Sequence, residues 1–257
     1  MLARGIPYCG TPPSPGTLLG RWNLDPLLIL VFAAVWVAYG LFAARRVSPG
    51  RQWAFHGGWG LTLLFLICPL CPLSVSLFSA RVSQHMLLTM VGAPLVALGL
   101  PEGPQRRWSN PILAAAVFAL ALWFWHAPGP YDATFQSTPV YWAMHLMLYG
   151  SALWLWRGLL VRPGERLAQA IGAGALTAGQ MGLLAAAITF ASRPIYAPHA
   201  LTTWAWGLTP LGDQELGGAI MWAPAGAILA GALVFGLATA MRRAAHDDLA
   251  TPLAGGF

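Results

Sequence analysis

The feature that most constrains the fold of this chain is the length of its uncharged segments. Cutting the 257-residue sequence at its charged residues leaves seven apolar stretches of 19 or more residues each. A helix of about 20 apolar residues crosses the hydrocarbon core of a bilayer. With 57% apolar and 9% charged residues, the chain is also too apolar for a soluble domain of this length. The stretches are residues 26–44, 52–80, 82–101, 108–131, 133–156, 167–192 and 216–241.

These stretches predict an all-α fold: a polytopic membrane helical bundle with seven transmembrane helices. An eighth uncharged stretch, 194–212, contains three Pro, two Gly and three Thr, so we expect an interfacial loop there. The first 25 residues lack the apolar core of a signal peptide, and the first span is expected to be an uncleaved anchor. The predicted organisation is a short external segment at 1–25, a transmembrane domain at 26–241 and a cytoplasmic tail at 242–257.

The arginines predict the orientation of the bundle. All 14 basic residues are Arg, and ten of them lie at 45–51, 106–107, 157–166 and 242–243, in alternate loops and the tail. The other side of the membrane holds only four. The positive-inside rule therefore places the N-terminus outside and the C-terminus in the cytoplasm, and we expect a multi-pass protein of the inner (plasma) membrane. The sequence shows no basic patch interleaved with aromatic residues, so we expect no nucleic-acid partner. Membrane lipid is the predicted surrounding of the bundle.

Side chains that bind soft metals gather toward the predicted outer face. Histidines occur in the outer parts of the third, fourth and fifth spans, a Cys-x-x-Cys pair closes the second, and a methionine lies in the outer part of the seventh. Imidazole, thiolate and thioether together favour copper, and the sulfur ligands select the cuprous ion. The predicted metal ligands are His85, His126, His145, Met221, Cys68 and Cys71.

Each of these residues also has a simpler interpretation. A buried His or Gln can hydrogen-bond across helices for about 0.6 kcal/mol, and a Met usually only packs. Cys68 and Cys71 can form a disulfide or remain inert thiols, and Cys9 leaves an odd thiol in any scheme with a single disulfide. Asp132 can be a helix cap. The convergence of so many ligand types at one depth favours a shared site.

The polar pattern also limits the class of function. No Ser-His-Asp triad, paired carboxylate or phosphate-binding loop is visible, so we expect no enzymatic activity. A membrane electron carrier with haem between His85 and His145 is an alternative. A small-solute or copper transporter is a third, although its polar residues should continue to the cytoplasmic face.

Arg81 is expected to mark the outer water boundary, with its guanidinium reaching the interface.

Four segments together resemble the CtaG-type cytochrome c oxidase assembly proteins, which are polytopic membrane proteins. They are LFSARVSQHM at 77–86, WHAPGPYDATF at 125–135, HLMLYG at 145–150 and DQELGGAIMWAP at 213–224. The resemblance runs from about residue 26 to 241. It implies a role in maturing a haem-copper oxidase, with copper delivered or inserted from the outer (periplasmic) side. Oxidase subunits and a copper chaperone are the implied partners.

The same resemblance implies roles for individual residues. Arg81 stands where the family's first paired His would lie, and Cys68 and Cys71 are candidate replacement ligands. The positions that match the family's motifs are His85, His126, His145 and Met221, with Asp132, Asp213, Gln214 and Trp222 as supporting residues.

Overall fold

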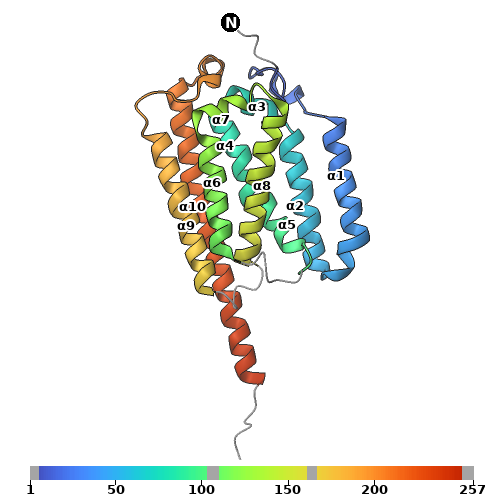
Figure 1. Ribbon diagram of the computed structural model, residues 1–257. Helices are drawn as coiled ribbons and strands as arrows, with labels where there is room; N and C mark the ends of the chain where they lie inside the picture. Colours follow the sequence, from blue (N-terminus) through green and yellow to red (C-terminus); the bar gives the residue numbers. More distant parts are fainter. Residues whose placement is uncertain (1–5, 103–109, 161–166, 251–257) are drawn as a thin grey trace, which may run out of the picture.

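The protein is a bundle of long helices that lie side by side. The computed structural model describes residues 6–102, 110–160 and 167–250, and all regular structure within those ranges is helical. The N-terminal segment lies at one end of the bundle, and the last helix projects from the other end (Figure 1). We call the end with the N-terminal segment the outer end, as the arginine distribution predicts. The all-α prediction is confirmed.

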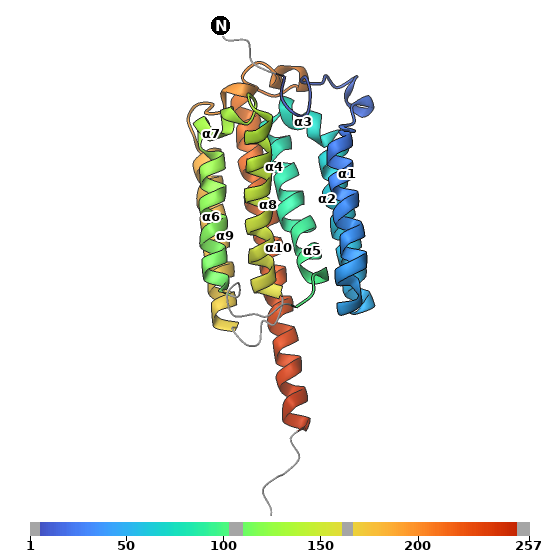
Figure 2. The same cartoon turned by 45° about the vertical axis from the view of Figure 1, so that its right-hand side comes forward.

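The helices follow one another in simple order along the chain. They are α1 (Pro26–Ala38), α2 (Pro49–Ile67), α3 (Leu70–Ser76), α4 (Phe78–Leu87), α5 (Ala93–Gly99), α6 (Pro111–His126), α7 (Pro128–Ala133), α8 (Thr138–Leu160), α9 (Leu167–Thr189) and α10 (Pro210–Ala250). Shorter helical turns are η1 (Leu18–Gly20), η2 (Tyr39–Ala43), η3 (Ala44–Arg46), η4 (Leu88–Gly92), η6 (Ala197–His199) and η7 (Thr203–Trp206). Turning the bundle shows α4 and α8 in its middle and α1 at its edge (Figure 2).

Three helical segments of the described chain are long and apolar enough to cross a membrane, and the number rises to four if a bent pair is one span. The three are Pro26–Arg46, Phe78–Gly99 and Leu167–Thr189, and the pair is α2 with α3, bent by 46°. Helix α6 is apolar but shorter. Membrane-spanning helices are thus present, whereas the number seven and the orientation remain predictions.

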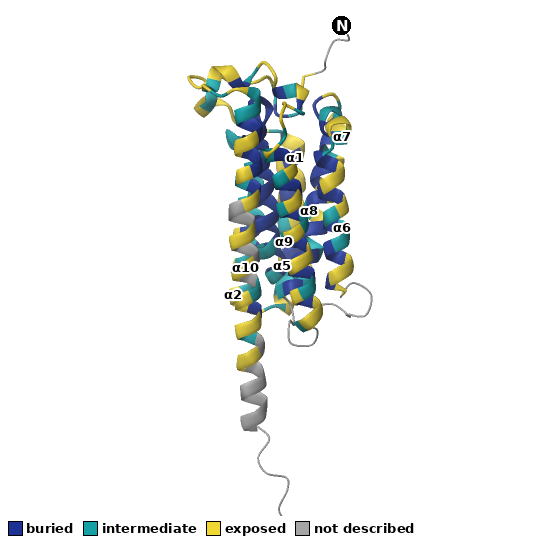
Figure 3. Cartoon of the chain, turned by 90° about the vertical axis from the view of Figure 1, so that its left-hand side faces the viewer, coloured by how far each residue is buried: buried dark blue, intermediate teal, exposed yellow. Residues whose placement is uncertain are grey.

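The outward faces of the helices carry large apolar side chains, and several polar residues of the helices, among them His85, His145 and Gln214, lie inside. Figure 3 shows exposed residues along the outside of the helices and buried ones between them. The exposed set includes Leu30, Leu120, Leu183 and Val234. A surface of this kind suits hydrocarbon rather than water, in agreement with a membrane protein.

Prolines move several of the predicted boundaries. The stretch 52–80 is broken because Pro69 begins a new short helix, and α4 then starts at Phe78, so the LFSA segment enters the third span and does not end the second. Helix α6 ends at His126, before Pro128, because a residue that precedes proline favours an extended backbone. Residues 194–209 form only short turns, as expected of a loop. Helix α10 continues to Ala250, so the predicted tail begins as helix.

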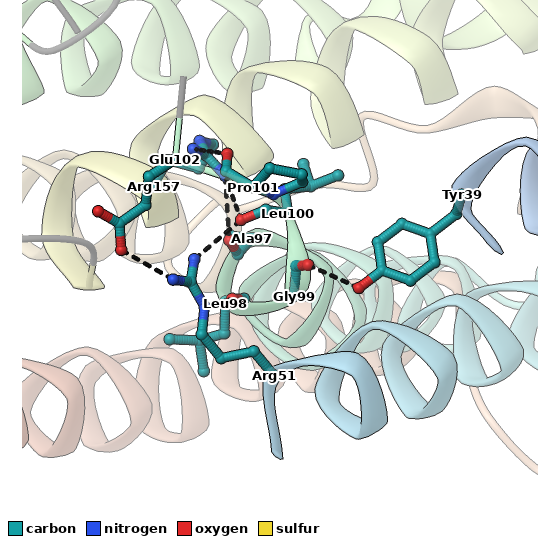
Figure 4. Close-up of polar contacts among 9 residues, drawn as sticks. All are labelled: Tyr39, Arg51, Ala97, Leu98, Gly99, Leu100, Pro101, Glu102 and Arg157. Atoms are coloured by element: carbon teal, nitrogen blue, oxygen red, sulfur yellow. Dashed lines mark hydrogen bonds and ion pairs between the residues drawn. The ribbon is translucent and has the colours of Figure 1, made fainter. Parts of the chain in front are cut away.

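Two of the arginines that the sequence placed in loops lie in helices, Arg51 in α2 and Arg157 in α8, and they bind the carbonyl groups at the end of α5 (Figure 4). Arg51 donates from Nε to the Leu98 carbonyl at 2.7 Å and from Nη2 to the Leu100 carbonyl at 2.8 Å. Arg157 donates from Nη2 to the Pro101 carbonyl at 2.9 Å. The last carbonyls of a helix lack partners within the helix, and a guanidinium carries several donors. Arginines predicted to set the orientation therefore also fix the inner end of α5.

Glycines bring α2 close to the segment that continues α4. A Cβ atom placed on Gly92 would lie 2.5 Å from the Thr62 hydroxyl, and one on Gly58 would lie 2.7 Å from the Val96 backbone nitrogen. Both distances are too short for a real side chain, so these positions require Gly. Gly92 thus allows the close approach of α2 to this segment. This contact fixes the position of the span that begins with α4.

Candidate metal site

Three histidines from three different helices meet in the interior of the bundle. His85 comes from α4, His126 from the end of α6 and His145 from α8. The His85 ring centroid lies 5.3 Å from that of His145 and 6.2 Å from that of His126. None of the three is more than 5% exposed. The structure thus brings together three of the residues that the sequence singled out.

The hydrogen bonds of two rings determine which nitrogen is available. Nδ1 of His145 bonds the Tyr141 carbonyl at 3.0 Å, and Nδ1 of His126 bonds the Leu122 carbonyl at 2.8 Å. A carbonyl only accepts, so each Nδ1 carries the hydrogen and each Nε2 keeps its lone pair. Such a backbone bond orients a ligand histidine and fixes its tautomer. Helical i to i−4 spacing therefore presents two Nε2 atoms as available ligands.

Several imidazole nitrogens in this cluster have no hydrogen-bond partner. Both ring nitrogens of His85 and Nε2 of His145 are buried and unsatisfied within the described chain. A buried polar atom without a partner costs about 1–3 kcal/mol. Such a cost is expected where the protein alone does not complete the site. The three side chains are referred to below as the histidine cluster.

The histidine cluster is not arranged around a single point. Among the described residues, no group of three or more His, Cys, Asp or Glu side chains is placed to hold a metal ion as it stands. The His85 ring meets the other two nearly edge-on, at interplanar angles of 79° and 82°. The chemistry of the donors still fits copper, since imidazole is among its preferred ligands. Binding would require the rings to turn, and the free nitrogens of His85 permit this.

The predicted sulfur ligands differ in bonding and in position. Cys71 forms a disulfide with Cys9, with 5.4 Å between their Cα atoms, and Cys68 is a partly buried free thiol. The predicted role of Cys71 as a thiolate ligand beside Cys68 is therefore wrong for this oxidised form, because the Cys71 sulfur is already bonded. Met221, in α10, is fully buried in the main core. No described contact joins its sulfur to the histidine cluster, so ligation by Met221 stays a prediction.

The disulfide fastens the N-terminal segment over the outer end of α8. Tyr8 stacks on Tyr141 with ring centroids 4.9 Å apart, and Tyr141 lies 4.2 Å from the His145 ring. The Tyr8 hydroxyl donates to the Asp25 carboxylate at 2.5 Å. This bond lowers the pKa of Asp25, and burial raises the pKa of Tyr8. Tyr8 and Cys9 of the N-terminal segment thus contact Tyr141, which in turn contacts the histidine cluster.

Arg81 lies one turn before His85 and does not reach the surface. Its side chain is 3% exposed, and its guanidinium carbon lies 4.3 Å from the ring centroid of Phe135 and 5.1 Å from that of Tyr131. Nη2 donates to the Thr134 hydroxyl at 2.9 Å. The expectation that this guanidinium extends to the water interface is therefore wrong. The short helix α7 and the residues after it enclose it, and the apolar pattern of the sequence gave no indication of that fold.

The outer loop contributes a buried histidine that the sequence did not single out. His199 is 2% exposed, and its Nε2 hydrogen-bonds the Tyr131 hydroxyl at 2.6 Å. Burial and the nearby positive charge of Arg81 lower the pKa of His199 to about 3. Asp132, a predicted supporting residue, is half-buried in α7, directly after Tyr131 in the sequence. No spacing rule connects a loop residue such as His199 to α7.

Asp213 and Gln214 support the site through the backbone. Asp213 is fully buried and accepts hydrogen bonds from the Phe78 and Ser79 backbone nitrogens at 2.6 and 3.1 Å. It thereby caps the first turn of α4, the helix that carries His85. Gln214 accepts from the Ile195 nitrogen and donates to the Ile188 carbonyl, which joins α10 to the end of α9. These contacts give both residues a structural role.

The rest of the DQELGGAIMW segment packs α10 against its neighbours. A Cβ atom on Gly217 would lie 2.4 Å from the Phe78 ring, and one on Gly218 would lie 2.9 Å from the Ala185 carbonyl. Small residues at these places allow α10 to approach both α4 and α9. Trp222 is 50% exposed and lies on the outside of the bundle. Any effect of Trp222 on the histidine cluster is therefore indirect.

The comparison with known families gives one match. The sequence model for the cytochrome c oxidase caa3 assembly factors (Caa3_CtaG) matches residues 30–243. This range contains all four segments on which the resemblance was based, and it includes the histidine cluster. No match is found among curated proteins or among solved structures.

Proposed function

Because this chain belongs to the cytochrome c oxidase caa3 assembly factor family, we propose that it assists copper delivery or insertion into the oxidase from the outer side of the membrane. In this proposal copper is cargo that is bound and passed on, and no covalent chemistry is required of the protein. Oxidase subunits are the recipient partners, and a copper chaperone is the proposed donor.

The observation that carries the proposal is the histidine cluster with its unsatisfied nitrogens. His126 and His145 present Nε2 atoms whose tautomers are set by backbone carbonyls, and His85 has two buried nitrogens without partners. Neutral imidazoles bind copper well. The cluster lies toward the outer end, beneath the N-terminal segment, which suits exchange with a donor and a recipient on that side.

The alternatives receive less support. A haem between His85 and His145 would separate the two rings, yet here they contact each other at 5.3 Å between centroids. Toward the inner end, the partly buried His56 accepts a hydrogen bond at Nδ1 from the Trp36 indole nitrogen at 2.6 Å. Among the described residues, the buried hydroxyls of Thr62, Thr89 and Thr177 bond carbonyls of the chain segments that carry them, and this gives a transporter no particular support.

The proposal is tested in cells that depend on this protein for oxidase assembly. In a His85→Ala/His145→Ala variant the protein should remain in the membrane, because neither imidazole makes a hydrogen bond to another helix in the described structure. Oxidase activity should fall, oxidase subunits should still be made, and excess copper in the medium should partly restore activity. His56→Gln, at the inner end of α2, is the matched control and should leave activity unchanged. Full oxidase activity in the double variant at normal protein abundance would contradict the proposal.

Met221→Leu separates ligation from packing in the same assay. Leu keeps the volume and apolarity of Met but lacks the thioether. A fall in copper content at normal protein abundance would add Met221 to the ligands. Unchanged copper content would leave Met221 as a core residue.

A further inference from the structure

The guanidinium of Arg81 is a buried charge whose described direct contacts are with aromatic rings and one hydroxyl. The carboxylates of Asp132 and Asp213 act electrostatically on Tyr131, which provides one of those rings. Three aromatic rings surround it: those of Phe135 and Tyr131, and that of Tyr141, whose centroid lies 5.7 Å from the guanidinium carbon. Its one hydrogen bond to a described side chain goes to the hydroxyl of Thr134, and its Nε has no partner in the described chain. The ion pair found among the described residues is at the other end of the bundle, between Arg51 and Glu102.

Packing alone does not account for this charge. An aromatic cage stabilises a cation by about 1–2 kcal/mol when it is desolvated, whereas removing an ion from water costs several kcal/mol. An uncharged side chain of similar length would fill the same space without that desolvation cost. The charge is therefore expected to act on something outside the cage.

The histidine cluster lies within reach of this charge. Arg81 and His85 are four residues apart on one face of α4, where side chains are neighbours. The ring of Tyr141 is a neighbour of both groups: its centroid lies 5.7 Å from the Arg81 guanidinium carbon and 4.2 Å from the centroid of the His145 ring. If the separation is taken as ~8 Å, which these two distances allow, and the effective dielectric constant as about 20, each unit of positive charge on a bound ion is disfavoured about 30-fold. A divalent ion suffers this penalty twice, and a monovalent ion once.

We propose that Arg81 determines the specificity of the histidine cluster, making it accept a monovalent soft cation and reject divalent cations. This inference rests on the proposed function and adds the charge of the cargo, which is the cuprous rather than the cupric ion. Three imidazoles without such a neighbour would be a good site for Zn²⁺. The fixed charge of Arg81 removes that preference without contacting the ion.

The experiment compares two cations on the purified full-length protein in lipid nanodiscs. Ag⁺ serves as a soft monovalent ion that does not change its oxidation state, and Zn²⁺ serves as the divalent ion. Bound metal is measured by mass spectrometry after competition with a chelator of known affinity. The variants are Arg81→Gln and Arg81→Met, which remove the charge, and Arg81→Lys, which keeps it. Two neutral variants are included so that one remains if the other fails to fold.

The wild-type protein should bind Ag⁺ and hold Zn²⁺ much more weakly. In Arg81→Gln or Arg81→Met the ratio of Zn²⁺ to Ag⁺ affinity should rise about 30-fold, and Arg81→Lys should stay close to the wild type. The same ratio in the neutral variants and the wild type would overturn the specificity role while leaving the metal site in place. Absence of Ag⁺ binding in the wild type would overturn the proposed function together with this inference.

Discussion

Replacing Asp213 should destabilise the helix that carries His85. Asp213 accepts hydrogen bonds from the Phe78 nitrogen at 2.6 Å, from the Ser79 nitrogen at 3.1 Å and from the Ser79 hydroxyl at 2.5 Å. Asp213→Ala leaves two backbone N–H groups of the first turn of α4 buried without partners. Each costs about 1–3 kcal/mol, so the expected loss in free energy of unfolding is about 2–6 kcal/mol. At about 2–4 °C per kcal/mol, the midpoint of thermal unfolding should fall by about 10 °C.

The measurement is thermal unfolding of the detergent-solubilised protein followed by circular dichroism. Asn110→Ala is the matched control, because Asn110 also caps a helix, accepting from the Ile112 and Leu113 nitrogens at 3.1 and 3.2 Å. Asn110 is exposed, so its removal should cost only about 1 kcal/mol. Equal effects of the two substitutions would refute the argument that burial makes the Asp213 cap more important. The supporting role of Asp213 would then need another cause.

Three further predictions concern the disulfide, the outer loop and the topology. Without reduction, alkylation of the denatured protein should label one cysteine, Cys68, and three labelled cysteines would contradict the pairing. Cys9→Ser should lower the free energy of unfolding by up to about 4 kcal/mol, because the disulfide closes a loop with a sequence separation of 62. His199 is neutral in the folded protein and binds a proton more readily when unfolded, so stability should fall as the pH drops from about 6.5 toward 3, by at most about 1.4 kcal/mol per pH unit. His199→Gln should reduce this slope in unfolding measured against pH, and an unchanged slope would exclude His199 as its source. Reporter fusions after Arg46, Arg107, Arg166 and Arg243 should be cytoplasmic and those after Pro139 or within 194–212 external, where an external signal at Arg107 would reverse the assigned orientation.

The helical class and the meeting of the histidines were predictable because both follow from periodic patterns. Long uncharged stretches predict helices, and a histidine among apolar residues in a membrane helix must face the interior. Those two rules together predicted that His85, His126 and His145 would lie inside the bundle at similar depth. The predicted loop at 194–212 followed from its prolines. The positions Arg107 and Arg166, used for topology, lie outside the described residues.

The errors arose where the chain departs from regular helices. Helix α7 is a six-residue turn after a proline, and it places Thr134 and Phe135 against Arg81. The position of Arg81 near the end of a predicted membrane helix led us to expect that its guanidinium reaches water. That reasoning does not foresee a short helix that folds over the side chain. The pairing of Cys71 with Cys9 depends on how the N-terminal segment returns over α8, and sequence spacing carries no information on that path. Contacts that depend on irregular chain were therefore not predictable.

X-ray absorption spectroscopy of the protein loaded with cuprous copper tests most directly whether the histidine cluster holds copper. The wild-type protein should hold one copper per chain with scattering typical of imidazole nitrogens. The His85→Ala/His145→Ala variant should lose this copper, and His56→Gln should keep it. Wild-type protein that retains no copper, or copper with unchanged imidazole scattering in the double variant, would contradict the proposed copper site.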